Sequence, residues 1–264
     1  VDALDAAQLP DGTLDDPAAC GMGAPGWKPA VEPSPMRPHA RHVYALAQPV
    51  IATHLRVVMI PDGGISRFRA HGVITDEGWR LAGLVHLNAM DRDRAMQALL
   101  ACCGSTAWAE EMLARRPFAD PDSLKTAAGE TWRDLSTADH LEAFAAHPRI
   151  GETSPPATNT AATNSAATNS AATNSAWSAA EQSGTADADQ GVMAELAEGN
   201  RAYEERFGHV FLIRAAGRSA EDVLAALRQR LTNDPGTEVT VAAVQQAEIT
   251  QLRLDRLLME GPSR

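Results

Sequence analysis

The stretch LEAFAAHPRIGE, residues 141–152, decides how most of the chain is interpreted. Leu141 and Phe144 follow the i, i+3 spacing of one apolar helix face, so the stretch predicts the end of a buried amphipathic helix. The helix would end at His147, because Pro148 disfavours helical backbone in the residue before it. A protonated histidine near a helix C-terminus is favoured by the helix dipole. Capping alone explains this histidine, and a catalytic role needs support from elsewhere in the sequence.

Length and charge limit the classes of partner. The chain has 264 residues, which is enough for one or two domains with a real core. Its formal net charge of −11 argues against non-specific binding to nucleic acid or to an anionic membrane surface. We therefore expect neither nucleic acid nor a membrane among the partners.

The cysteines and the chain ends indicate where the protein works. The sequence has three cysteines, Cys20, Cys102 and Cys103, and the last two are adjacent. Because the number is odd and adjacent cysteines do not easily bridge each other, we expect no disulfide framework, and a reducing compartment is indicated. No apolar run approaches the ~18 residues of a membrane-spanning helix. The start, VDALDAAQLPDG, lacks the features of a signal peptide, and a peroxisomal targeting signal is absent. A cytoplasmic location is expected.

The N-terminal part carries the β pattern of the chain. Residues 53–60, THLRVVMI, alternate apolar and polar side chains, and so do residues 65–72, ISRFRAHG. The PDGG sequence between them, residues 61–64, has turn chemistry, so the pattern predicts a β-hairpin. A lone hairpin is marginally stable in water, so we expect this segment to dock on another surface.

The chain is expected to turn helical from about residue 87. Asp91, Ser105 and Thr137 are each placed to cap the start of a helix. Apolar residues recur at helical spacing in three later segments, residues 190–206, 219–231 and 238–259. This gives about seven or eight helices and no convincing strand. The fold class is therefore mainly α, an all-helical domain preceded by a small β-hairpin segment.

A low-complexity tract interrupts the helical part. Residues 158–176, TNTAATNSAATNSAATNSA, repeat every five residues without a charge or a large apolar side chain. Such a segment buries too little surface to offset chain entropy, so we predict a disordered insertion over residues 153–176. The predicted domains are residues 1–80 and residues 81–264.

Two further segments are ambiguous by themselves. In SAAEQSG, residues 178–184, Ser178 and Glu181 fit the capping box S-x-x-E, which would leave Gln182 facing solvent. The segment AAGRS, residues 215–219, is a glycine-containing entry to a helix, whose backbone N–H groups can bind an anion. The histidines lack the spacing of a metal site, so no metal ligand is predicted.

The order of the motifs is more informative than any one of them, and it resembles the decarboxylases that act on 2-oxo-4-hydroxy-4-carboxy-5-ureidoimidazoline (OHCU). The resemblance covers roughly residues 87–260 and rests on CCGSTAW (102–108), RRPF (115–118), AFAAHPRIGE (143–152), EQSG (181–184), NRAYEERFG (200–208), FLIRAAGRS (211–219) and RLTND (230–234). It implies an all-α fold, a homodimer, no metal or cofactor, and the last step from urate to S-allantoin. The link between Gly151 and Trp177 is longer than in the family.

The same resemblance assigns roles to residues. It implies that His147 is the proton donor, a role that suits an imidazole with a pKa near 6.5 and that the helix dipole would assist. Glu181 would accept hydrogen bonds from N–H groups of a small anionic ureidoimidazoline. The implied substrate-binding set is Pro148, Ser178, Gln182, the backbone from Ile213 to Gly217, Arg218 and Arg253. Upstream enzymes of urate degradation are further candidate partners.

The N-terminal segment carries a second resemblance. PHARHVYAL and ATHLRVVMIPDGGISRFRAHG, within residues 27–79, resemble the C-terminal part of allantoicase, a β-sandwich enzyme of the same pathway. Only that part is present, so we expect no allantoicase activity in this chain. Two alternatives to a decarboxylase remain open: a non-catalytic helical interaction module, and a fragment of a bifunctional allantoicase and OHCU decarboxylase.

Overall fold

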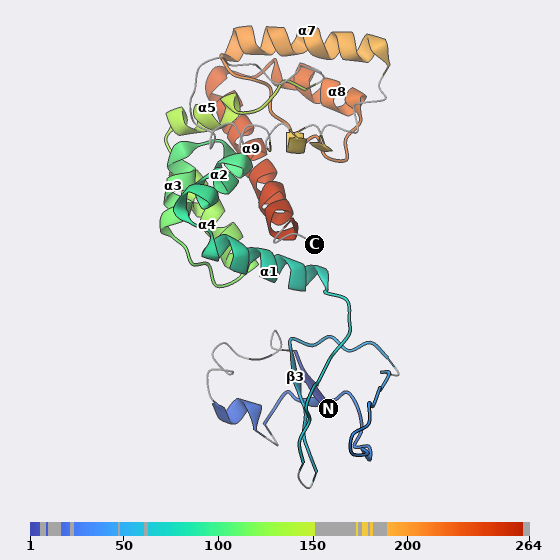
Figure 1. Cartoon of the computed structure of the whole chain (residues 1–264). Coiled ribbons are helices and arrows are strands. Elements are labelled where there is room, and N and C mark those ends of the chain that lie inside the picture. The colour runs from blue at the N-terminus through green and yellow to red at the C-terminus, as the bar shows by residue number, and fades with distance from the viewer. Residues whose placement is uncertain are drawn as a thin grey trace. The chain divides into compact units, whose positions relative to one another are not determined.

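A computed structural model of the chain divides into two compact units, residues 1–72 and residues 73–264. Figure 1 shows the first unit with its short strands and the second with its helices. The division predicted after residue 80 falls within helix α1 (Asp76–Ala89). The structure describes residues 1–5, 9, 17–21, 24–46, 48–60, 63–150, 173, 176–178, 180–181 and 189–260.

The first unit holds a three-stranded antiparallel sheet in the order β2-β1-β3. Its strands are β1 (Asp2–Leu4), β2 (Lys28–Pro29) and β3 (His54–Arg56). The register pairs Ala3 with Lys28 on one side and with Leu55 on the other. An ion pair of 2.6 Å between Arg56 and Asp2 fastens β3 to β1.

The predicted β-hairpin is wrong. Strand β3 pairs with β1 near the start of the chain, and residues 65–72 form no strand. Strand β1 supplies the buried apolar positions, Ala3 at 3% and Leu4 at 1% exposure, whereas Phe68 of the expected second strand is 48% exposed. Strand β3 therefore pairs with β1, which buries apolar side chains, and not with the segment that follows it in the sequence. Residues 61 and 62 of the expected turn lie outside the described residues.

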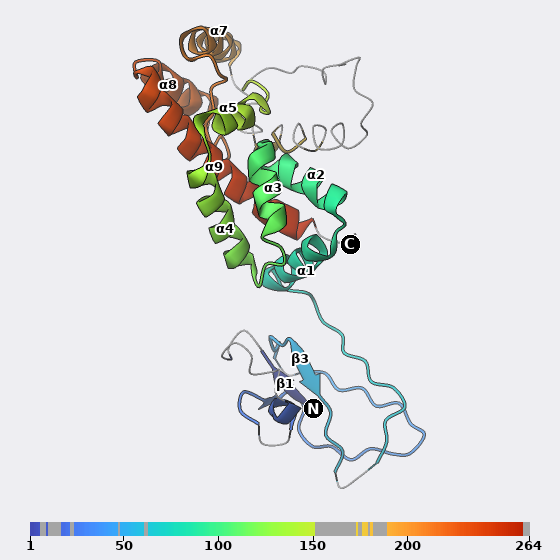
Figure 2. The same cartoon turned by 90° about the vertical axis from the view of Figure 1, so that its left-hand side faces the viewer.

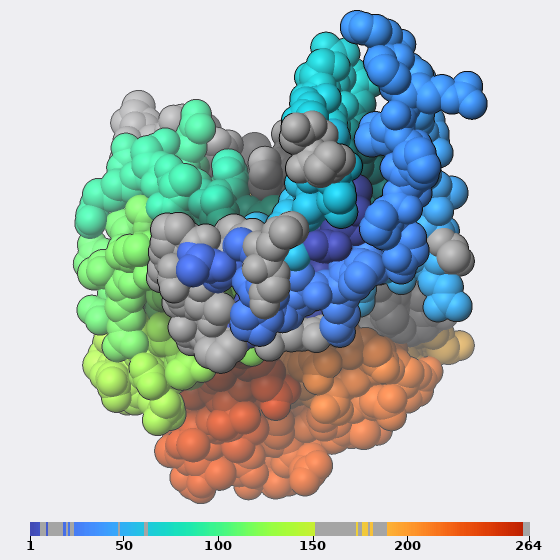
Figure 3. All heavy atoms as spheres, turned by 90° about the horizontal axis from the view of Figure 1, so that it is seen from below, coloured from blue at the N-terminus to red at the C-terminus, as the bar shows by residue number. Residues whose placement is uncertain are grey.

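The first unit leaves much of its apolar surface uncovered. Of its described residues, only Ala3 and Leu4 are buried. Figure 3 shows blue residues of this unit as an arm from which side chains project. The exposed apolar side chains of its middle stretch are Met36, Val43, Tyr44, Leu46, Val50 and Ile51.

The described residues of the second unit form helices joined by loops, with no strand among them. Its helices are α1 (Asp76–Ala89), α2 (Arg92–Cys103), α3 (Thr106–Ala114), α4 (Pro121–Asp134), α5 (Thr137–Ala145), α7 (Gln190–Phe207), α8 (Ala220–Arg230) and α9 (Pro235–Met259). Residues 176–178 and 180–181 are also helical. The helical part begins earlier than the predicted residue 87, because Thr75 caps α1 by accepting a hydrogen bond from the Gly78 N–H.

Most predicted helix ends are confirmed. Asp91 and Ser105 cap α2 and α3 by accepting hydrogen bonds from backbone N–H groups. The cap of α5 is wrong by one residue, since Ser136 is the cap and forms a reciprocal capping box with Asp139. Gly208 ends α7 in the left-handed region, with φ of 76°, where glycine carries no steric cost.

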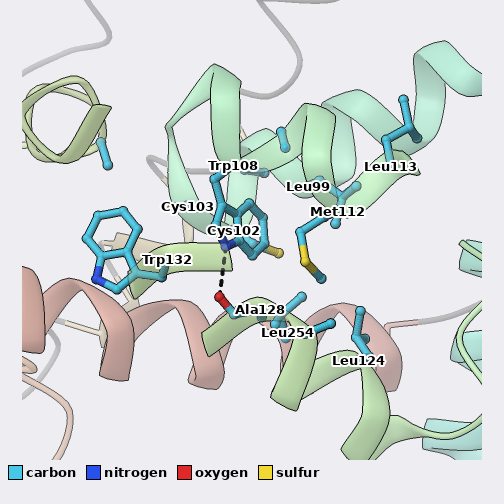
Figure 4. Close-up of a cluster of buried hydrophobic side chains, with 14 of the residues drawn as sticks. Leu99, Cys102, Cys103, Trp108, Met112, Leu113, Leu124, Ala128, Trp132 and Leu254 are labelled. Atoms are coloured by element: carbon cyan, nitrogen blue, oxygen red, sulfur yellow. Dashed lines mark hydrogen bonds between the residues drawn. The ribbon is translucent and has the colours of Figure 1, made fainter. Parts of the chain in front are cut away.

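Helix α9 is the axis of the helical unit. It contacts α1, α2, α4, α5 and α7, and Figures 1 and 2 both show α1 near one of its ends and α8 near the other. A core cluster around α2, α3, α4 and α9 is drawn in Figure 4, where the Trp108 indole N–H donates to the Ala128 carbonyl over 3.1 Å. A second cluster joins α7 and α8 to residues 211–215 through Leu196, Phe211, Ile213, Val223 and Leu227.

The crossing of α1 and α9 requires a glycine. A Cβ added at Gly83 would lie 2.0 Å from the carbonyl oxygen of Leu258. We therefore expect Gly83→Ala to lower the free energy of unfolding by about 1–3 kcal/mol, because backbone must move to admit the methyl group. Urea unfolding followed by circular dichroism measures the change.

Gly129 in α4 is the matched control for that substitution. A Cβ there meets no atom closer than Gln251 Nε2 at 4.0 Å, so Gly129→Ala should raise stability by about 0.5–1 kcal/mol through helix propensity. If the two variants were equally stable, the close approach of α1 and α9 would be contradicted.

Candidate active site

His147 lies just beyond the C-terminus of α5. Its backbone N–H donates to the Phe144 carbonyl over 3.1 Å, which continues the last turn of the helix by one residue. The residue is only 8% exposed, so its imidazole lies inside the unit and not in solvent. Arg149 of the same motif binds the Glu204 carboxylate on α7, with N–O distances of 2.6 and 2.8 Å, and therefore has a structural role.

A cavity brings His147 together with segments that are distant in the sequence. Its space amounts to about 320 Å³ when the part open to solvent is counted. Three polar side chains, those of His147, Ser178 and Glu181, face an otherwise mainly apolar wall, which is the usual composition of a small-molecule site. The lining residues are His147, Pro148, Ile150, Ser178, Glu181, Phe211, Leu212, Ile213, Ala215 and Ile249.

Arg253 of α9 holds two of the polar residues in place. Its guanidinium donates to both carboxylate oxygens of Glu181 over 2.9 Å and to Ser178 Oγ over 2.8 Å. A further hydrogen bond of 3.2 Å reaches the Ala101 carbonyl, and Arg253 is fully buried. This two-oxygen geometry fixes the position of the Glu181 carboxylate.

The capping-box interpretation of Ser178 and Glu181 is wrong. Ser178 has helical backbone, whereas the cap of a helix lies outside it. Both side chains bind Arg253 instead. A buried guanidinium demands hydrogen-bond partners more strongly than an exposed helix end does, so the long-range contact outweighs the local one.

The environment of His147 favours its neutral form. Burial strips water from the imidazolium, and the nearby positive charge of Arg253 adds to this effect, so together they lower the pKa of His147 to about 3. The side chain of Gln246 acts in the opposite direction. The expectation that the helix dipole keeps this histidine protonated is wrong, because the dipole contributes only about 0.3–1 kcal/mol.

The remaining predicted site residues divide into three groups. Pro148 and Ile213 line the cavity with the polar residues, while Arg253 supports it from behind Glu181 and Ser178. Gly217 and Arg218 are exposed and do not belong to the lining, and the Arg218 N–H donates to the Ala215 carbonyl over 3.0 Å. Gln182 lies outside the described residues.

Sequence reasoning missed most of the apolar wall. Phe211 and Leu212 belong to the segment FLIRAAGRS and Ile150 to the His-Pro-Arg-Ile-Gly motif, which were visible signals, whereas Ile249 gave none. Arg230 of α8 holds this wall: its guanidinium donates to the Leu212 carbonyl and lies 4.7 Å from the centre of the Phe211 ring.

A buried acid completes the support of the wall. The Glu238 carboxylate is fully buried and accepts hydrogen bonds from Arg230 Nε over 2.7 Å and from Asn233 Nδ2 over 2.6 Å. The Tyr203 hydroxyl also donates to it. The RLTND motif, residues 230–234, therefore acts through the packing of the cavity wall.

The described ranges hold neither a cluster of metal ligands nor a membrane-spanning helix. No group of three or more His, Cys, Asp or Glu side chains is arranged there to hold a metal ion. In the same ranges, no helix combines the length and the apolar character needed to cross a membrane.

Comparison with known sequences defines the family. The OHCU decarboxylase family profile matches residues 88–255, and an allantoicase repeat matches residues 3–75. The chain belongs to the OHCU decarboxylase family, and its N-terminal unit resembles a repeat of allantoicase.

Individual relatives agree with this division. The Arabidopsis thaliana "Uric acid degradation bifunctional protein TTL" is 34% identical over 160 residues, which are 60% of this chain and 46% of that protein. A "Probable allantoicase" of Streptomyces avermitilis is 44% identical over 52 residues, 20% of this chain and 14% of that protein. This chain therefore spans less than half the length of either relative.

A solved structure matches the helical unit. A crystal structure of OHCU decarboxylase in the presence of (S)-allantoin has 31% sequence identity and a TM-score of 0.50, and the match covers 62% of this chain and 99% of that one. The likeness supports the helical fold over the length of that whole chain.

Proposed function

We propose that this chain decarboxylates OHCU to S-allantoin and CO2 without a cofactor. The cavity is the observation that carries the proposal, because it gathers His147, Ser178 and Glu181 from separate parts of a chain that belongs to this family. The proposed substrate is small and anionic, and the side chains of His147 and Ser178 offer it hydrogen-bonding groups at the cavity wall.

The apolar wall favours loss of CO2. Phe211, Leu212, Ile213 and Ile249 offer little to stabilise a charged carboxylate, whereas the departing CO2 is neutral. The wall therefore destabilises the bound carboxylate more than the transition state, in which that charge is already leaving the carboxylate. This lowers the barrier to decarboxylation, since only interactions that improve toward the transition state accelerate a reaction. Glu181 is held by Arg253 in a position to accept hydrogen bonds from substrate N–H groups, which would orient the ring.

His147 is proposed to supply the proton. The empty site holds it neutral, and a bound anion beside the imidazole would favour the imidazolium. The bond to the carboxylate carbon then breaks, its electron pair passes into the ring, and CO2 leaves. His147 gives its proton to the ring carbon from one face and returns to its neutral resting state.

The wider substrate-binding set extends this proposal. Pro148, Ser178 and Ile213 are proposed to contact the substrate from the cavity wall. Gln182, Gly217, Arg218 and Arg253 are proposed members of the same set. We also propose a homodimer, as the family resemblance implies.

The N-terminal unit favours a second proposal, that this chain is part of a bifunctional protein. The allantoicase repeat at residues 3–75 is the supporting observation. An allantoicase-like region beside a decarboxylase would place two activities of one degradative route in one protein. The repeat lacks most of the length of an allantoicase relative, so the decarboxylase activity is assigned to the helical unit.

A direct assay tests the first proposal. Freshly generated OHCU is mixed with the purified full chain, and the decay of its ultraviolet absorbance is compared with that in buffer and with heat-denatured protein. We expect decay that accelerates in proportion to enzyme concentration. Decay at the spontaneous rate at every concentration would contradict the proposal.

A further inference from the structure

Gln246 of α9 is a buried amide beside the site whose orientation is fixed. It is fully buried, and its Nε2 donates to the Cys103 carbonyl and to Thr250 Oγ1, each over 3.2 Å. A carbonyl oxygen only accepts hydrogen bonds, so the atom facing Cys103 is the nitrogen. Both protons of the amide are used in this way, and its oxygen remains available.

Two buried polar atoms near the cavity lack partners among the residues that the structure describes. Within the described part of the chain, neither Gln246 Oε1 nor His147 Nε2 forms a hydrogen bond of ordinary geometry. The Gln246 side chain nevertheless raises the pKa of His147, which places the amide next to the imidazole. Leaving a buried polar atom unpaired is unfavourable, so a matching donor and acceptor in one place call for a functional explanation.

We propose that Gln246 is the positioning residue of His147, with Gln246 Oε1 facing the imidazole Nε2–H in the empty site and accepting a shorter hydrogen bond from it when substrate is bound. This inference rests on the proposed decarboxylation. Catalytic hydrogen bonds are often long in an empty site and shorten when the substrate binds. The amide is anchored to the Cys103 carbonyl at the end of α2, so the ring orientation is tied to the core of the unit.

The contact also selects a tautomer. A neutral imidazole carries one proton, and an acceptor at Nε2 keeps that proton on Nε2. Nδ1 then holds the lone pair in the resting enzyme. The proton taken up with the substrate goes onto Nδ1, and Nδ1 is the atom that delivers it to carbon.

The substitution Gln246→Met tests this role. Methionine has a similar length and no carbonyl acceptor, so kcat should fall about 10- to 100-fold through loss of orientation, with KM nearly unchanged. The matched control is Gln251→Met on the same helix, which removes a hydrogen bond of 3.0 Å to the Lys125 carbonyl away from the cavity. The control should keep the parental kcat.

A spectroscopic readout separates positioning from stability and from activity. Long-range proton–nitrogen correlations of the full chain report the tautomer of His147, whose signals are assigned by their loss in His147→Asn. We expect the parent and Gln251→Met to show the Nε2–H tautomer near pH 7, and Gln246→Met to gain Nδ1–H.

The outcomes are distinguishable. An Nδ1–H tautomer in the parent would overturn the inference, and this measurement does not require Gln246→Met to fold. An unchanged tautomer together with an unchanged kcat in Gln246→Met would also overturn it. If the parent shows Nε2–H and Gln246→Met loses it while the parent has no decarboxylase activity, the positioning contact stands and the proposed function fails.

Discussion

His147→Asn is expected to reduce decarboxylation by about 10²–10⁴-fold, the usual contribution of a positioned general acid, while the helical unit stays folded. Asparagine keeps a polar side chain in the cavity and does not take up and return a proton near neutral pH. The parent and the variant are compared by kcat with freshly generated substrate and by far-ultraviolet circular dichroism for fold.

His209 provides a matched control. It is 7% exposed, close to the 8% of His147, and its Nε2 likewise lacks a partner among the residues that the structure describes. Its ring packs against Phe144 at 5.2 Å and does not line the cavity. His209→Asn should therefore change stability and leave kcat within a few-fold. Equal losses of kcat in the two variants would return His147 to a packing role.

Acid titration gives a second signature of His147. Its folded pKa of about 3 lies below the 6.5 of an unperturbed histidine, so between these values the unfolded chain binds more protons. The free energy of unfolding contributed by this group therefore falls as the pH falls, by at most about 1.4 kcal/mol per pH unit. Urea unfolding at several pH values should show the parent losing stability relative to His147→Asn below pH 6.5. A difference that does not vary with pH would contradict a buried, neutral histidine.

Arg253→Met is expected to lower the free energy of unfolding by about 3–5 kcal/mol, because it leaves the buried partners of a hydrogen-bonded ion pair uncompensated. Ser178 Oγ and both oxygens of Glu181 lose a donor at once. Decarboxylation should also fall, since both side chains lose their fixed positions in the cavity. Urea unfolding and the assay of freshly generated substrate measure the two effects.

The neighbouring arginine on the same helix is the control. Arg256 pairs with Glu260 over 2.8 Å, but its side chain is 38% exposed, so Arg256→Met should cost less than about 1 kcal/mol. The double variant Arg253→Met with Glu181→Gln should recover part of the lost stability, because the unpaired carboxylate is removed. If the two arginine substitutions cost the same, the central role of Arg253 would be disproved.

Local chemistry predicted the helical unit well. Asp91 and Ser105 mark the starts of helices because each satisfies backbone groups within a few residues of itself. The β-hairpin failed for the opposite reason: the partner of β3 is β1, about fifty residues away, and no local pattern encodes that pairing. Alternation in sequence identifies a strand and does not identify its neighbour.

In the site, too, features set by neighbouring residues in the sequence were predictable, and features set by distant residues were not. The His-Pro-Arg-Ile-Gly motif pointed to His147, and the order of the motifs linked it with Glu181. The charge state of His147 was not predictable, because burial and Arg253 set it from far along the chain. Gln246 was missed because a glutamine inside a long helix carries no signal until its amide is seen to face Cys103 and His147.

The optical activity of the product tests the central account most directly. If the cavity protonates the ring carbon from one face, the parent chain should yield a circular dichroism signal of S-allantoin that rises as OHCU disappears. Spontaneous decay gives a racemate without such a signal. His147→Asn should slow the appearance of the signal in step with its loss of kcat. Racemic allantoin from the parent chain, or optically active allantoin at the parental rate from His147→Asn, would contradict the account.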